Sequence, residues 1–223
     1  MAIKPILFNT EMVRAILDGR KSCTRRICKD ANEYTVPDMD FYNADRRTYA
    51  VHNYADREQT EQLSVVERNC PICPGDILYV RETFIQIAAH TFWYKADGKS
   101  WMLKDLRWKP SIHMPKEAAR IWLKVTDVRV ERLQKIDEDG VWDEGFRFTP
   151  PCLTRVSADG HTCDLDGPCT SRIKYCDMTM EELFGRELWD KTIKKSDLDR
   201  CGWQANPWVW VIEFERCEKP QEV

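Results

Sequence analysis

Residues 10–26 read TEMVRAILDGRKSCTRR, and this short amphipathic segment followed by a basic turn is the part of the sequence that decides the fold. Thr10 is a residue type that caps helix N-termini. Four apolar residues recur at helical spacing on one face: Met12, Val13, Ile16 and Leu17. Gly19 follows as a left-handed stop. The sequence therefore predicts a helix over 10–18. The residues that follow Gly19 are expected to be positioned by this helix but not buried beneath it.

The turn after this helix concentrates reactive and charged groups. It contains an amine, two hydroxyls, a thiol and several guanidinium groups. No acidic residue occurs between Asp18 and Asp30, and the cations there are Arg20, Lys21, Arg25, Arg26 and Lys29. Such a run predicts a local anion site, although a solvated basic turn explains the same residues. Cys23 is a candidate thiol nucleophile, but no histidine lies near it in the sequence.

Two further segments alternate in the manner of β-strands. Residues 77–87 follow a Pro-Gly-Asp turn and are expected to pair with residues 91–96 in a hairpin. Residues 119–133 alternate along their whole length, and a break near Thr126 predicts a bulge or corner. The middle of the chain therefore indicates a protein built mainly from strands.

The C-terminal half adds two helices and a strand. Residues 137–144 begin with acidic residues, which suit the positive end of a helix dipole. Thr179 and Glu182 have the spacing of a capping box and predict a packing helix that begins at residue 180. Residues 207–215 are apolar on both faces, which is typical of a strand covered on two sides.

Length and composition limit the domain organisation. The chain has 223 residues, of which 43% are hydrophobic, so one core with long insertions at 30–69 and 147–178 is the simplest interpretation. A net charge of -3 argues against a protein that coats nucleic acid through bulk charge, so any nucleic-acid contact is local. No apolar run approaches the roughly 20 residues that cross a bilayer, and no secretory h-region is present. We therefore expect a cytoplasmic protein without a membrane partner.

The chain contains ten cysteines, which we expect to be reduced in the cytoplasm. The second insertion holds Cys152, Cys163, Cys169 and Cys176, with His161 beside them. A structural zinc ion would stabilise this segment, which has few apolar residues. Free thiols are the alternative, because the gaps between these cysteines match no usual zinc pattern. Cys70 and Cys73 do have Cys-x-x-Cys spacing. A second possible zinc site therefore combines this pair with two of the four cysteines of the insertion.

Five motifs together resemble the ASCH family of PUA-like proteins, in the version carried by many bacteriophages and prophages. They are GRKSCTRR at 19–26, CPICPGD at 70–76, YVRE at 79–82, WKPSIHMP at 108–115 and PWVWVIEF at 207–214. The resemblance covers most of the chain except the two insertions. It implies an α+β fold, a small PUA-like (ASCH) β-barrel with flanking helices.

Proteins of this kind include bacterial amidohydrolases that remove the acetyl group from N4-acetylcytidine. The resemblance assigns their reactive lysine, threonine and glutamate to Lys21, Thr24 and Glu144. The Thr24 hydroxyl needs a base, and Lys21 is one where burial and neighbouring arginines favour its neutral amine. Glu144 then activates water and carries the proton to the leaving amine. Each residue also has an ordinary explanation: a solvated lysine, a threonine bonded to backbone, and a glutamate near a helix end.

The middle motifs supply further candidate residues for binding a ligand. Arg81 and Glu82 are expected to point outward from a strand with otherwise apolar positions. The loop at 108–115 offers Trp108 for stacking on a base, with Ser111 and His113 for its polar edge. A single histidine such as His113 is also commonly structural.

Three functions remain open from the sequence. The first is binding of RNA, or of a modified nucleoside or nucleotide, with Trp108 stacked on a base. The residues expected to hold phosphate are Lys21, Arg25, Arg26 and Arg81. The second is hydrolysis of an N4-acylated cytidine, and the third is cleavage of single-stranded RNA with Glu144 as base. None of these requires a cofactor for its chemistry.

Overall fold

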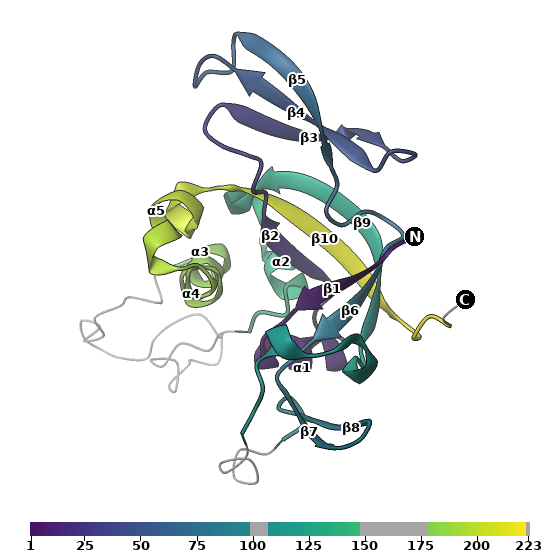
Figure 1. The fold of residues 1–223 in the computed structure, drawn as a ribbon. Coiled ribbons are helices and arrows are strands. Elements are labelled where there is room, and N and C mark those ends of the chain that lie inside the picture. The colour runs from purple at the N-terminus through teal and green to yellow at the C-terminus, as the bar shows by residue number, and fades with distance from the viewer. Residues whose placement is uncertain (99–106, 148–177, 222–223) are drawn as a thin grey trace, which may run out of the picture.

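The computed structural model describes residues 1–98, 107–147 and 178–221. Within these ranges the fold is α+β and consists mainly of strands, with short helices around them (Figure 1). The strands form sheets of five, three and two strands. Most of the insertion predicted at 147–178 lies outside the described residues.

A five-stranded mixed sheet organises the molecule, in the order β1-β6-β9-β10-β2. Its strands are β1 (Ile3–Leu7), β2 (Cys23–Ile27), β6 (Ile77–Arg81), β9 (Trp122–Arg132) and β10 (Trp208–Cys217). β1 runs parallel to β6, and the other neighbours are antiparallel. Among the described residues no ladder joins β1 to β2, so the sheet is open and does not close into the expected barrel.

The long strands β9 and β10 pair along their whole lengths and cross the middle of the sheet. Glu213 pairs with Asp127 and Phe214 with Val125, which leaves Thr126 as the extra residue of a bulge. The break predicted near Thr126 is therefore confirmed.

Strand β10 is covered on both faces, as its apolar sequence predicts. Trp210, Ile212 and Phe214 belong to the main core. Val209 and Val211 belong to a second cluster, which includes residues of the helices that follow residue 137. The two faces of this strand therefore contribute to two separate clusters.

Part of the insertion predicted at 30–69 forms a second, antiparallel sheet, which lies above one end of the central sheet in Figure 1. Its strands are β3 (Thr35–Asn43), β4 (Thr48–Tyr54) and β5 (Gln62–Asn69). Tyr49 of β4 packs edge-on against Trp210, with 4.7 Å between ring centroids. Tyr49 and Val51 thereby join the main core, whereas β5 is almost entirely exposed.

The strand predicted over 77–87 is interrupted after residue 81. β7 (Phe84–Ala88) instead pairs with β8 (Thr91–Tyr94), so the predicted hairpin is confirmed. At the interruption, the Glu82 carboxylate accepts hydrogen bonds of 2.8 and 3.1 Å from Arg120. A tertiary ion pair therefore lies at the point where the strand breaks.

Two helices frame the basic turn. α1 (Thr10–Leu17) is confirmed, but its N-cap is Asn9 rather than Thr10, because Asn9 Oδ1 accepts a hydrogen bond from Met12 N at 2.9 Å. α2 (Glu138–Asp143) is capped by Asp137, which accepts from Gly140 N. Both helices therefore begin with side-chain caps, as acidic and amide residues favour.

The remaining helices cover the second cluster. They are α3 (Met180–Phe184), a π-helical turn (Gly185–Trp189), α4 (Asp190–Thr192) and α5 (Leu198–Cys201). The capping box predicted for Thr179 and Glu182 is present. Short 3-10 turns lie at Ser111–His113, Lys116–Ala118, Leu133–Lys135, Lys195–Asp197 and Trp203–Ala205. In the three described ranges, no helix combines the length and the apolar character of a membrane span.

Candidate functional site

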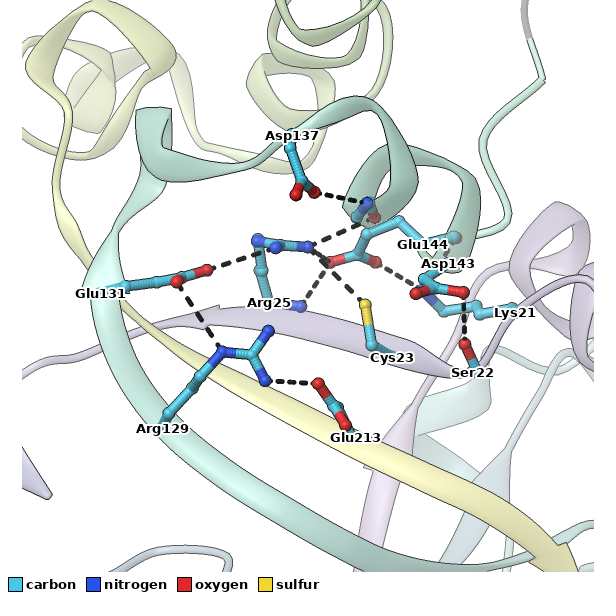
Figure 2. Close-up of polar contacts among 11 residues, drawn as sticks. Lys21, Ser22, Cys23, Arg25, Arg129, Glu131, Asp137, Asp143, Glu144 and Glu213 are labelled. Carbon is cyan, nitrogen blue, oxygen red and sulfur yellow. Dashed lines mark hydrogen bonds and ion pairs between the residues drawn. The ribbon is translucent and has the colours of Figure 1, made fainter. Parts of the chain in front are cut away.

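The basic turn and the end of α2 meet in a buried ion pair (Figure 2). Lys21 Nζ lies 2.5 Å from Glu144 Oε2 and 2.9 Å from the Glu144 carbonyl oxygen. The side chains are almost fully buried, with exposed fractions of 0% and 3%. Two of the three residues that the resemblance assigns to catalysis thus meet, although they are 123 positions apart in the chain.

The second carboxylate oxygen of Glu144 is also held. Arg25 N donates to Glu144 Oε1 at 2.6 Å, which satisfies an outward backbone group of the edge strand β2. Next to this contact, Ser22 N donates to the Asp143 carbonyl oxygen at 2.9 Å and Ser22 Oγ donates to Asp143 Oδ1 at 2.8 Å. Backbone and side-chain contacts therefore fix the Glu144 carboxylate against the edge of β2.

Charges of alternating sign continue from this pair across the sheet (Figure 2). The Arg25 guanidinium lies 3.7 Å from Glu144 and 3.3 Å from Glu131. Arg129 follows, 3.8 Å from Glu131 and in contact with Glu213. Arg25, expected to bind a ligand, is instead only 4% exposed and is bound to internal carboxylates.

The cations of the basic turn differ from the expected free anion site. Arg20 pairs with Asp18 at 2.9 Å, and Lys21 and Arg25 are neutralised as described above. Most of the neutralising acids lie far away in the sequence. In the described chain, Arg26 and Lys29 are the cations of the turn without a carboxylate at ion-pair distance.

Gly145 allows the end of α2 to approach the turn closely. Its φ of 75° lies in the left-handed region that favours glycine. A Cβ atom at this position would lie 2.7 Å from Ala15 Cβ and 3.0 Å from Lys21 Cβ. The absence of a side chain at residue 145 therefore lets Glu144 reach Lys21.

The Cys23 thiol lies inside the same network. Arg25 Nη1 is 3.6 Å from Cys23 Sγ. Burial, and then the charge of Glu144, raise the pKa of this thiol to about 12. Cys23 is therefore protonated near neutral pH, which argues against a thiolate nucleophile.

Thr24 and Arg26 lie on the face of β2 opposite to the one that carries Cys23 and Arg25, because side chains alternate along a strand. Thr24 is 1% exposed, and its hydroxyl forms no hydrogen bond with the described residues. Arg26 Nη2 donates to the Leu7 carbonyl oxygen at 2.8 Å, across the gap between β2 and β1. Burial lowers the pKa of Arg26, and the charge of Glu144 partly opposes this shift. Arg26 thus bridges the open side of the sheet.

A hollow of about 350 Å³ lies beside this bridge, and we call it the Arg26 hollow. Its lining includes Leu7, Phe8, Asn9, Arg26, Pro110 and Ser111. Lys21 Nζ lies 5.5 Å from the centroid of the Phe8 ring, and the Arg26 guanidinium lies 5.3 Å from it. A neighbouring hollow of about 330 Å³ is lined in part by Glu144 and shares Met12 with the first. The ion pair is therefore close to a space of ligand size.

The middle motifs contribute unequally to this region. Glu82 is 1% exposed, so the expectation that it points outward is wrong. Burial raises the pKa of Glu82, although the hydrogen bonds from Arg120 oppose this shift. Arg81 donates to the carbonyl oxygen of Ile112, which fastens the 108–115 loop to β6. These two residues therefore have structural contacts.

In the 108–115 loop, Ser111 lines the Arg26 hollow. His113 is exposed, and Trp108 is half-buried and does not line that hollow. Of the three loop residues predicted to bind a base, Ser111 is thus the one that the structure places at this hollow.

The four cysteines predicted as zinc ligands lie outside the described residues, together with His161: Cys152, Cys163, Cys169 and Cys176. Cys70 and Cys73 are buried free thiols. Across residues 1–98, 107–147 and 178–221, no group of three or more histidine, cysteine or acidic side chains is arranged to hold a metal ion. Structural zinc therefore stays a prediction.

Phe8 and Glu131 were not identified from the sequence. Phe8 directly precedes the helix cap and carries no signal of its own. Glu131 alternates with apolar residues along β9. A charged residue at this position of a long, otherwise apolar strand is the sequence signal that could have identified it.

Comparisons of the chain with protein-family models, curated proteins and solved structures found no match.

Proposed function

We propose that this chain is an ASCH-type, PUA-like protein that binds a nucleoside unit of RNA, or a modified nucleoside, in the Arg26 hollow. The proposal depends on one observation, which is that the Arg26 guanidinium lines the hollow and is only partly bonded. Among the described residues it donates to one backbone carbonyl, that of Leu7, and it has no carboxylate partner. Its remaining N–H groups suit a phosphate or the edge of a base. In this proposal, the open sheet corresponds to a barrel with its seam between β1 and β2.

The other walls of the hollow suit the same ligand. Phe8 and Pro110 supply apolar surface, and Ser111 supplies a hydroxyl. Small-molecule sites are commonly apolar hollows of about 300–1,000 Å³ with a few polar groups, and this one lies within that range. Unpaired bases of RNA are recognised by such combinations of apolar contact and edge hydrogen bonds.

Hydrolysis of an N4-acylated cytidine is a second candidate, which the Lys21–Glu144 pair favours. An ammonium bound to a carboxylate is a proton donor, so Lys21 would act as the acid and Glu144 as the base. Glu144 would take a proton from the attacking water, whose oxygen bonds to the acyl carbon. The carbon–nitrogen bond then breaks, and Lys21 protonates the leaving amine. These roles reverse the base role expected for Lys21.

The two candidates are separated by incubating the protein with N4-acetylcytidine and with single-stranded RNA, and by measuring binding calorimetrically and products by mass spectrometry. Binding without a product supports the first candidate, and released acetate supports the second. Shortened RNA supports the ribonuclease alternative. A protein that neither binds nor converts these compounds contradicts the proposal.

Replacing Arg26 tests the binding site itself. We expect Arg26→Ala to weaken nucleoside binding by about tenfold or more, because charge-assisted hydrogen bonds contribute about 1.5–3 kcal/mol. Arg46→Ala is the matched control, because it removes an exposed arginine from the β3–β4 turn. Equal affinity of the Arg26 and Arg46 variants would exclude Arg26 from the site.

Thr24→Val then tests whether hydrolysis, if observed, needs the Thr24 hydroxyl.

A further inference from the structure

A larger hollow adjoins the Arg26 hollow and has no role in the function proposed above. It has a volume of about 730 Å³, and residues at the end of β2, at the start of β10 and within 192–205 line it. We call it the Trp208 hollow, and its lining includes Lys29, Arg132, Lys194 and Trp208. It shares Thr192 with the Arg26 hollow. A third hollow, lined in part by Arg26, shares Ile27 and Lys29 with it. The hollows therefore meet around residues 26–29.

Three cations on the wall of the Trp208 hollow have no acidic partner among residues 1–98, 107–147 and 178–221. Lys29 and Lys194 are exposed, and neither has a carboxylate at ion-pair distance within the described chain. Arg132 Nη1 donates to the carbonyl oxygen of Asn206 at 3.1 Å, and in the described part of the chain no carboxylate pairs with it. Burial lowers the pKa of Arg132. Positive charge on this wall is therefore available to an external anion.

The acids on the same wall are already neutralised. Glu33 forms a hydrogen bond of 2.6 Å with Arg57 Nε. Asp197 lies 3.6 Å from Arg200, which also lines the hollow. The wall therefore keeps an excess of positive charge, in a chain whose net charge is -3.

Trp208 adds a flat aromatic surface and a hydrogen-bond donor that no described residue accepts from. The Arg132 guanidinium carbon lies 4.3 Å from the centroid of its ring, so the two groups stack. Trp208 Nε1 is buried and has no acceptor among the described residues. A buried donor without an acceptor is unfavourable, so this group favours an acceptor from outside the described chain.

We infer that the Trp208 hollow holds the phosphodiester backbone of a single-stranded RNA while one of its nucleosides occupies the Arg26 hollow. This inference rests on the proposed function and specifies its ligand as a polynucleotide rather than a free nucleoside. Unpaired lysines and arginines beside an aromatic ring are the groups that hold single strands. The shared residues of the hollows let one strand extend from one to the other.

The test measures the affinity of a fluorescently labelled single-stranded RNA over a series of salt concentrations. In Lys29→Ala/Lys194→Ala, we expect about tenfold weaker binding at low salt. We also expect the slope of log K against log salt to decrease by about 1.4, from about 0.7 for each lost phosphate contact. The control Lys195→Ala/Lys219→Ala removes the same charge at exposed residues that do not line the Trp208 hollow. The control should bind RNA like the wild type.

Free N4-acetylcytidine, measured with the same variants, separates the two proposals. We expect its affinity to be unchanged in Lys29→Ala/Lys194→Ala. If both double variants lose RNA affinity equally, or if the wild type binds RNA no more tightly than the free nucleoside, the backbone path is wrong and the nucleoside site stands. If nucleoside binding is insensitive to Arg26→Ala, the proposed function itself fails.

Discussion

Glu144 joins distant parts of the chain through one carboxylate. It accepts hydrogen bonds from the Lys21 ammonium and the Arg25 amide, and it lies near the Arg25 guanidinium. Burying such charges is unfavourable unless each remains paired. The position of the Glu144 carboxylate therefore depends on Lys21 and Arg25, and the positions of these two residues depend on Glu144.

We predict that Glu144→Gln lowers the free energy of unfolding by about 3 kcal/mol, because the buried Lys21 ammonium would lose its counter-charge. Urea denaturation followed by circular dichroism measures this change. Asp143→Asn is the control, because Asp143 is exposed and bonds only at the rim of the network. We expect it to cost about 1 kcal/mol or less. Equal losses in the two variants would show that the buried pair has no special weight.

The sequence predicted part of this site. The resemblance brought Lys21 and Glu144 together as candidates, and the structure places them in contact. The free cations of the turn could not be predicted correctly, because Glu131 and Glu144 neutralise Arg25 from more than 100 positions away. A local charge count contains no information about such tertiary partners.

Two glycines with the same backbone conformation differ in their surroundings. Gly19 and Gly145 have φ values of 72° and 75°. Nothing lies within 4 Å of a Cβ built at Gly19, whereas one at Gly145 would meet Ala15 and Lys21. The end of α1 is therefore open, and the end of α2 is closely packed.

This difference leads to a prediction for alanine variants. We expect Gly19→Ala to cost about 1 kcal/mol from backbone strain alone. Gly145→Ala should cost about 3 kcal/mol, because the new methyl group also displaces Ala15 and Lys21. Thermal unfolding of both variants gives the comparison. Similar midpoints would mean that the close approach of α2 does not position Glu144.

Elements with a local signal were predicted well. The helix over 10–18, the bulge near Thr126 and the capping box at Thr179 each follow from periodicity or from a cap within a few residues. The strand over 77–87 was predicted as continuous, but it breaks after residue 81, where Glu82 forms an ion pair with the distant Arg120. The sheet of β3 to β5 was missed, because exposed strands such as β5 lack the alternation that marks a half-buried strand.

At the scale of the whole molecule, Asp76 ties the N-terminus to both large sheets. Its carboxylate accepts from Ala2 N at 2.8 Å and from Lys4 Nζ at 2.9 Å, and it pairs with Arg47 beside β4. Burial raises the pKa of Asp76, but the hydrogen bonds from Lys4, Ala2 and Cys73 outweigh it, so the pKa lies below its ordinary value. The charged form therefore stabilises the folded state.

Acid unfolding tests this tie. A carboxyl group with a lowered folded pKa stabilises the protein above its unfolded pKa of about 4, and this contribution is lost as the pH falls through the folded value. We predict that Asp76→Asn lowers stability at neutral pH and flattens the pH dependence below about pH 4. Asp45→Asn, at an exposed residue, should leave the profile unchanged. A profile that Asp76→Asn does not alter would contradict the role of this carboxylate.

A crystal structure of the protein with an N4-acylated cytidine is the most direct test of the link between the buried Lys21–Glu144 pair and the Arg26 hollow. We predict that the base lies in this hollow and is hydrogen-bonded to Arg26, with Lys21 and Glu144 in contact close by. A nucleoside bound elsewhere, or Lys21 and Glu144 on separate sides of the molecule, would contradict the proposed site.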